Sequence, residues 1–141
     1  MTAPLDPEAE ARLRTWLADH VDDLPDGDLD VEVVSGGSSN LTLGVTVGDR
    51  RLIVRRPPIG HFLPTAHDMG REHRVYAALH GTDVPVPRAL GLCEDEAVIG
   101  APFYVMERLV GVVPHDPGAL AGADAATNAA CAEDYVQVLG H

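Results

Sequence analysis

A glycine-rich segment in the first third of the chain is the first group of residues that could do chemistry. It consists of Ser35, Gly36, Gly37, Ser38, Ser39 and Asn40. Paired glycines let backbone amides approach an anion closely, and the serine and asparagine side chains add hydrogen-bond donors. The same residue types also make plain hairpin turns between strands. Taken alone, the segment is compatible with a phosphate-binding loop and with a simple turn.

Two residues of opposite charge follow at larger spacings. Arg55 comes directly after the apolar run 52–54 and 18 residues after Gly37, and Glu72 comes 17 residues after Arg55. A strand arginine could bind phosphate oxygens if a helix carboxylate held and oriented it through a bidentate pair. The simpler explanations are that Arg55 and Arg56 are charges at an exposed strand end, and that Glu72 is a solvated helix residue.

The last feature is an apolar segment, Phe103 to Met106, that runs into a short link ending at Leu109. Its backbone N–H and C=O groups could bind the edge of a flat heterocycle, although such a segment is also typical of an ordinary inner strand. Each feature is common by itself. Their order, however, is that of a protein-kinase small lobe: a glycine-rich loop, a third-strand cation, a helix glutamate and an apolar strand.

Hydrophobic periodicity predicts the elements that would position these residues. Asp6 and Pro7 are a typical helix start, Thr65 is expected to cap a second helix, and Gly81 to end it. The expected order is a helix to about residue 21, strands at 31–34, 41–47 and 52–54, a helix to about residue 79, strands at 89–93 and 102–106, and a last helix at 125–139. A helix inserted into an antiparallel sheet of about five strands indicates an α+β fold.

Composition limits the functional classes. The chain has 141 residues and a formal net charge of −12, which argues against general nucleic-acid binding. No apolar run approaches the roughly 20 residues of a membrane span, so we expect no membrane partner. All ten basic residues are arginine, and six fall within 50–74, where an anionic ligand or a solvated face could account for them. The N-terminus has no secretory pattern, and Cys93 and Cys131 make no disulfide framework, so we expect a cytoplasmic protein.

The chain resembles the aminoglycoside phosphotransferase-like (phosphotransferase enzyme) family, and in particular the kinase-like domain of some acyl-CoA dehydrogenase family proteins. The matching stretches are 36–40, 52–60 (LIVRRPPIG), 64–75 (PTAHDMGREHRV), 84–88 and 99–108 (IGAPFYVMER). The resemblance covers about residues 7 to 113. It implies a kinase-like N-terminal lobe with an N-terminal helix at 1–109, a linker at 110–124, and at 125–141 the start of a truncated C-terminal lobe that begins with a helix.

The resemblance also implies an activity, the transfer of the ATP γ-phosphoryl group to a small-molecule hydroxyl, and a role for each matching residue. The acceptor molecule is not specified. The segment from Gly36 to Asn40 would cover the phosphates, Arg55 would replace the usual third-strand lysine, and Glu72 would be its helix partner. Met106 would back the adenine pocket, while Glu107 C=O and Leu109 N–H would hydrogen-bond adenine. Two departures are the arginine, a planar fork where lysine is a point charge, and the low glycine content of the loop.

The catalytic residues of the family are not found in the printed chain. Family members carry, in a C-terminal lobe, a catalytic aspartate, a following asparagine and a further aspartate that binds Mg²⁺. From 123 to 141 the acidic residues are only Asp124, Glu133 and Asp134, and His115-Asp116 lies in a segment rich in proline and glycine. We therefore assign no catalytic and no metal-binding residue. ATP and Mg²⁺ are the cofactors that the family implies, and we expect no phosphoryl transfer from the chain alone.

Two hypotheses about function follow. The first is a truncated phosphotransferase that retains some affinity for a nucleotide. The second is a non-catalytic binding or assembly module, completed by a partner chain or by self-association. A lobe cut from its neighbour should expose apolar surface, which we expect near Met69, Tyr76, Phe103 and the helix at 125–139.

Overall fold

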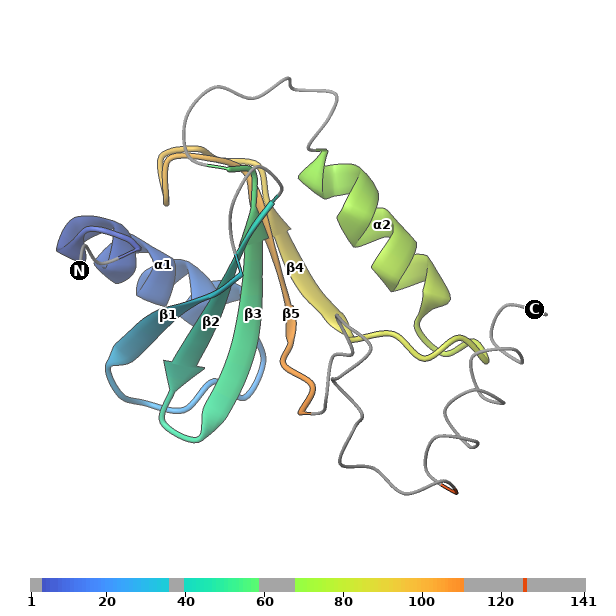
Figure 1. Cartoon of the computed structure of the whole chain (residues 1–141). Helices are drawn as coiled ribbons and strands as arrows, with labels where there is room; N and C mark the ends of the chain where they lie inside the picture. The colour runs from blue at the N-terminus through green and yellow to red at the C-terminus, as the bar shows by residue number, and fades with distance from the viewer. Residues whose placement is uncertain (1–3, 36–39, 59–67, 111–125, 127–141) are drawn as a thin grey trace.

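A five-stranded antiparallel sheet forms the centre of the molecule (Figure 1). The computed structural model describes residues 4–35, 40–58, 68–110 and Ala126. In chain order the elements are α1 (Pro7–His20), β1 (Leu29–Ser35), β2 (Leu41–Val47), β3 (Arg50–Arg56), α2 (Met69–Leu79), β4 (Ala89–Cys93) and β5 (Phe103–Glu107). The strands lie in the order β1-β2-β3-β5-β4, and every neighbouring pair is antiparallel. The predicted α+β fold is confirmed, while the linker at 110–124 and the helix at 125–139 fall almost wholly outside the described residues.

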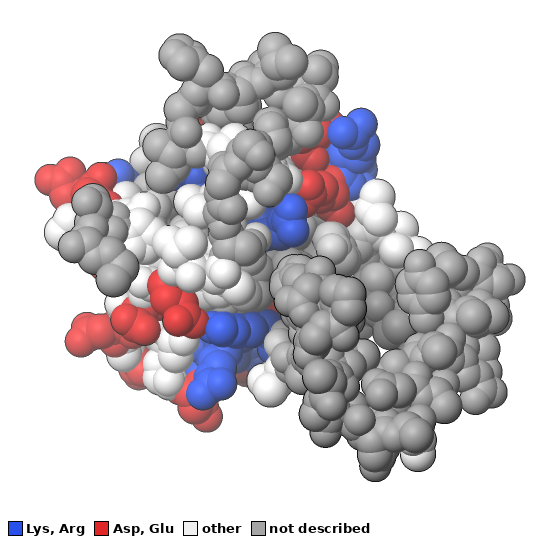
Figure 2. Space-filling model, in the orientation of Figure 1, with Lys and Arg blue, Asp and Glu red and all other residues white. Residues whose placement is uncertain are grey.

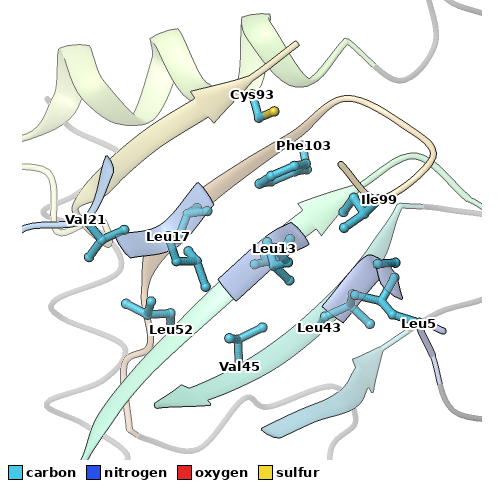
Figure 3. Close-up of a cluster of buried hydrophobic side chains, with 13 residues drawn as sticks. Leu5, Leu13, Leu17, Val21, Leu43, Val45, Leu52, Cys93, Ile99 and Phe103 are labelled. Atoms are coloured by element: carbon cyan, nitrogen blue, oxygen red, sulfur yellow. The ribbon is translucent and has the colours of Figure 1, made fainter. Parts of the chain in front are cut away.

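Helix α1 covers one face of the sheet. Oδ1 of its N-cap, Asp6, accepts a 2.7 Å hydrogen bond from Ala9 N, and Pro7 lies in the first turn, as the sequence predicts. Leu13 and Leu17 are one helical turn apart, so both project from the same face of α1. Both are fully buried (Figure 3). They belong to a core that includes Leu43, Val45, Leu52, Val54, Phe103 and Val105 from the sheet.

Helix α2 covers the opposite face. Ile53, Tyr104 and Met106 from the sheet form a smaller buried cluster with Met69 of α2. Tyr76 and Leu92 pack against this cluster. Because successive residues of a strand point to opposite faces, β3 and β5 contribute alternate side chains to the two cores. Figure 1 shows the result, with α1 and α2 on opposite sides of the sheet.

The start of α2 differs from the prediction. The expected cap, Thr65, lies outside the described residues, and the helix begins instead at Met69 with Asp68 as its N-cap. Oδ1 of Asp68 accepts a 2.9 Å hydrogen bond from Arg71 N. An aspartate can cap a helix or lie in its first turn, so the sequence pattern allowed both positions. The end of the helix agrees with the prediction, because Gly81 has a φ of +82°, a conformation that glycine adopts readily.

The buried position of Arg56 contradicts the interpretation of residues 55 and 56 as charges at an exposed strand end. The side chain is only 8% exposed. Its Nη1 donates a 2.7 Å hydrogen bond to the carbonyl oxygen of Ile99, and its Nε donates to that of Pro57 at 3.2 Å. Burial lowers the pKa of this guanidinium from its usual value. Since neighbouring strand residues alternate between faces, Arg56 projects toward the α1 side and Arg55 toward the α2 side.

The predicted exposed apolar surface is wrong for two of its residues. Met69 is 2% exposed and Phe103 is fully buried, because each packs within the chain between the sheet and a helix. Tyr76 is half-buried, and the predicted helix at 125–139 lies outside the described residues except for Ala126. The large apolar side chains that are exposed in the described part are Val33, Val34, Val75, Leu109 and Val110.

Charged side chains of both signs lie on the face of the molecule that Figure 2 shows. Basic side chains lie beside acidic ones there. The ion pairs among the described residues are Arg12–Glu8, Arg55–Glu72 and Arg108–Glu32. Neither described helix has the length and hydropathy needed to cross a membrane.

Candidate functional site

Glu72 on α2 is the centre of a polar network of four side chains. Its Oε2 lies 3.3 Å from Nε of Arg55 on β3 and accepts a 2.9 Å hydrogen bond from the hydroxyl of Tyr104 on β5. Its Oε1 accepts a 2.7 Å hydrogen bond from Nδ2 of Asn40, which directly precedes β2. The structure therefore brings Arg55 and Glu72 together, as expected from their spacing. Their role toward a ligand stays a prediction.

The contact between Arg55 and Glu72 is not the bidentate pair expected from the sequence. Among the described residues, Arg55 Nε is buried and makes no hydrogen bond, although it lies within ion-pair distance of Glu72. Glu72 accepts its hydrogen bonds from Asn40 and Tyr104 instead. The side chains of Arg55 and Glu72 are 28% and 31% exposed, so solvent and solutes can reach both. Because the two side chains are partly exposed, we expect their ion pair to stabilise the fold by only about 0–1 kcal/mol. The arginine could therefore turn to an anion at low cost.

The register of the sheet places the members of the network on one face. Arg55 lies opposite Tyr104 in the β3–β5 pair, and opposite Thr42 in the β2–β3 pair. Directly opposed residues of paired strands project from the same face. Helix α2 lies over this face, so Glu72 meets the side chains of both Arg55 and Tyr104.

Tyr104 is a member of the network that sequence reasoning missed. In the sequence it is one residue of an apolar strand, and its hydroxyl is the only sign of a polar contact. Burial raises the pKa of this hydroxyl above its usual value. The charge of Arg55 acts in the opposite direction, while the charge and the hydrogen bond of Glu72 raise the pKa further. Tyr104 is therefore protonated at neutral pH and able to donate to Glu72.

A groove of about 330 Å³ opens beside this network. It is lined by Arg55, Arg71, Glu72, Val75 and Tyr76. A somewhat larger hollow, about 440 Å³, lies between α1 and the turn at 95–98 on the other side of the sheet. We place the candidate site in the smaller groove, because two arginines and a glutamate line it, while the larger hollow has mostly apolar walls.

The other residues predicted to bind a nucleotide have different positions. Gly36, Gly37, Ser38 and Ser39 lie outside the described residues. Met106 is buried in the cluster under α2, on the same face as Arg55. The side chain of Glu107 is held by Arg88, whose backbone N–H donates to Oε1 at 3.0 Å. Leu109 follows the end of β5, and its side chain is 61% exposed.

The described residues suit a phosphate better than a metal ion. The side chain of Arg55 is 28% exposed and lines the groove, and phosphate oxygens are good acceptors for guanidinium groups. Within the same ranges no three His, Cys, Asp or Glu side chains come together as ligands for a metal ion. The described part therefore offers a guanidinium group suited to a phosphate, and no cluster of three metal-ligating side chains.

The fold and the network together define a class of protein. A five-stranded antiparallel sheet carries a helix between its third and fourth strands, and the glutamate of that helix meets a cation of the third strand. This is the arrangement of a kinase-like N-terminal lobe. The chain belongs to the phosphotransferase enzyme family, whose model matches residues 30–141. Helix α1 precedes the matched range.

Comparisons with known proteins agree with this class. A crystal structure of a Ralstonia eutropha protein, provisionally named an aminoglycoside phosphotransferase, superposes with a TM-score of 0.63 at 39% identity. The match covers 81% of this chain and 32% of that one. Acyl-CoA dehydrogenase family member 10 of Mus musculus is 47% identical over 81 residues, which are 57% of this chain and 8% of the relative. Acyl-CoA dehydrogenase family member 11 of Gallus gallus is 40% identical over 92 residues, 65% of this chain and 12% of the relative. The chain thus spans about a tenth of the length of these two relatives.

Proposed function

We propose that this chain is the nucleotide-binding part of an ATP-dependent phosphotransferase whose acceptor is the hydroxyl of a small molecule. The observation that supports the proposal is the position of Arg55, held 3.3 Å from Glu72 at the edge of an open groove. In protein kinases the cation of the third strand and the glutamate of the helix must both be in place for phosphoryl transfer. Family membership supports the same reaction class.

Each residue of the site has a proposed role. Arg55 binds phosphate oxygens, and Glu72, itself fixed by Tyr104 and Asn40, orients the guanidinium. The segment Gly36–Asn40 covers the phosphates. Met106 backs the adenine, and the backbone C=O of Glu107 and N–H of Leu109 hydrogen-bond its edge. An arginine in place of lysine offers a planar fork, so it can hold two phosphate oxygens at once.

We propose that the 141-residue polypeptide binds a nucleotide but does not by itself catalyse phosphoryl transfer. Phosphoryl transfer depends on groups that position the acceptor and the metal ions. The described residues supply neither a cluster of metal ligands nor a carboxylate in the groove other than Glu72. The division into a lobe at 1–109, a linker at 110–124 and a second-lobe segment at 125–141 remains a prediction, as does location in the cytoplasm.

Isothermal titration with Mg-ATP tests the proposal. We expect measurable binding by the wild-type chain and a loss of about tenfold or more in Arg55→Ala, since a hydrogen bond to a charged group contributes roughly 1.5–3 kcal/mol. Arg88→Ala is the matched control, because its side chain is exposed at the start of β4 and outside the groove. Equal affinities of the wild type and Arg55→Ala would rule out a specific role for this arginine.

A second proposal is that the groove side of the lobe is an assembly surface. Val75 lines the groove and is 51% exposed, and Leu109 and Val110 beyond β5 are 61% and 87% exposed. Exposed apolar side chains favour association where they join into one patch. Light scattering at several protein concentrations tests it: a monomer at the highest concentration would exclude self-association, and Val75→Ser would lower the mass of any oligomer that forms.

A further inference from the structure

An ion pair spans the face of the sheet on which the proposed nucleotide would lie. Nη1 of Arg108, just beyond β5, lies 2.5 Å from Oε1 of Glu32 on β1. Since the strand order is β1-β2-β3-β5-β4, the arginine side chain crosses β3 and meets the glutamate over Gly44 of β2. The two residues are 76 positions apart in the sequence.

The register shows that this pair lies on the α2 side of the sheet. Glu32 is opposite Gly44, Gly44 is opposite Ile53, and Ile53 is opposite Met106, so the four residues form one row across four strands. Opposed residues share a face, and Ile53 and Met106 belong to the cluster under α2. Arg55 and Arg108 stand two positions from Ile53 and Met106 and therefore project from the same face.

Gly44 provides the space that the pair occupies. A Cβ at this position would stand 2.7 Å from Arg108 Nη1, 2.9 Å from Glu32 Oε1 and 3.0 Å from Glu32 Cγ. Glycine within a strand weakens it and commonly marks a close approach by another group. Here that group is the Glu32–Arg108 pair, which lies directly against the backbone of β2.

We propose that the Glu32–Arg108 pair is a latch over the nucleobase side of the site, which a purine must displace in order to lie against Gly44 and Ile53. This inference rests on the proposed function, because Met106 and the backbone of Glu107 and Leu109, on either side of Arg108, are the proposed adenine contacts. The latch is weak. The side chains of Arg108 and Glu32 are 29% and 57% exposed, so their attraction is screened by solvent and salt.

Glu32→Gln tests the latch without threatening the fold, because the side chain is exposed and keeps its size. We expect this variant to bind adenosine and Mg-ATP about two- to fivefold more tightly than the wild type in calorimetric titrations, the range set by the strength of exposed ion pairs. Arg108→Ala should change affinity in the same direction. The affinity for inorganic tripolyphosphate, which has no base, should stay unchanged in Glu32→Gln.

Salt gives a second readout. Adenosine is uncharged, so added salt acts on its binding mainly by weakening the latch. Adenosine affinity of the wild type should rise between low and high ionic strength, while that of Glu32→Gln should stay constant. Glu8→Gln is the matched control: it breaks a comparable surface pair with Arg12 on α1, across the sheet, and should behave as the wild type.

The binding measurements distinguish failure of the latch from failure of the proposed nucleotide binding. In one outcome, Arg55→Ala loses the binding of ATP and tripolyphosphate, whereas Glu32→Gln and Arg108→Ala leave binding unchanged or weaken it. This outcome would overturn the latch and leave the proposed function standing. Absence of ATP binding by the wild type and by every variant would overturn the proposed function itself and the latch with it.

Discussion

The hydroxyl of Tyr104 donates a 2.9 Å hydrogen bond to Oε2 of Glu72, and this bond joins β5 to α2. Tyr104 is fully buried, and its Cα partner across the β3–β5 ladder is Arg55. A single carboxylate oxygen thus faces both the tyrosine hydroxyl and the guanidinium. The tyrosine fixes the glutamate from below, within the apolar cluster, and leaves the arginine at the open edge of the groove.

Replacing Tyr104 by phenylalanine should destabilise the fold without disturbing its packing. We expect the free energy of unfolding to fall by about 1–2 kcal/mol at neutral pH, because Glu72 loses a buried donor. Urea titrations of the wild type and Tyr104→Phe provide the measurement. Tyr76→Phe, on the same cluster but with a half-buried ring, is the control and should differ from the wild type by less than about 0.5 kcal/mol.

The same tyrosine should give the fold a characteristic loss of stability at high pH. Folding raises the pKa of Tyr104 above its ordinary value of 10.0. The unfolded chain therefore loses this proton first, so the contribution is complete below about pH 10 and declines as the pH rises further. Unfolding free energies from pH 8 to 11 should fall more steeply for the wild type than for Tyr104→Phe. Cys93, whose pKa is also raised by burial, is present in both proteins and cancels in the comparison. Identical slopes would contradict the assignment.

Arg56 should be a structural residue. Arg56→Met is expected to cost about 1–3 kcal/mol, because the buried carbonyl of Ile99 loses the donor that lies 2.7 Å away. Arg56→Lys should lose less, since an ammonium group can still donate to one of the two carbonyls. Arg51→Met, on the exposed part of the same strand, serves as the control. Chemical denaturation followed by circular dichroism measures all three, and a neutral Arg56→Met would show that the buried contacts are dispensable.

Helix α1 should be an integral part of the lobe, although it precedes the residues that match the family model. Leu13 is fully buried between α1 and the sheet. Leu13→Ala should lower the free energy of unfolding by about 2–5 kcal/mol, the usual range for a truncated core leucine. Thr15→Ala on the exposed side of α1 should change it by less than about 0.5 kcal/mol. If both variants unfolded at the urea concentration of the wild type, α1 would be an appendage to the core.

The ring of Trp16 should leave room only for a glycine at position 91. A Cβ at position 91 would stand 2.9 Å from Cη2 of Trp16, whose indole packs edge-on against Phe103 at a centroid distance of 5.0 Å. Gly91→Ala should therefore cost about 1–3 kcal/mol through overpacking. Trp16→Phe removes the colliding atom, so the double variant should be more stable than the sum of the two single effects predicts. Additive effects in this double-mutant cycle would show that the two residues do not interact.

The order of the described elements and the class of protein could be predicted from the sequence alone. Helical periodicity from Ala9 to Val21 and alternation in the strands depend on local spacing, and both kinds of prediction are confirmed by the structure. The spacing of Arg55 and Glu72 was informative because the order of elements around them is that of a kinase small lobe. The N-cap of α2 could not be predicted from the sequence, since Asp68 and Thr65 are both residue types that suit a helix start. The backbone conformation identifies Asp68 as the cap.

The contacts of the polar side chains, in contrast, depend on the tertiary structure. Asn40 and Tyr104 lie 32 positions on either side of Glu72, and Glu32 lies 76 positions from Arg108. No local pattern encodes such separations. Strand register brings these residues to one face of the sheet, and the same register sends the adjacent arginines 55 and 56 to opposite faces, one toward the groove and one into the interior. The physical reason is that pairing between strands depends on hydrogen bonds and burial summed over the whole sheet, whereas the sequence displays only neighbours along the chain.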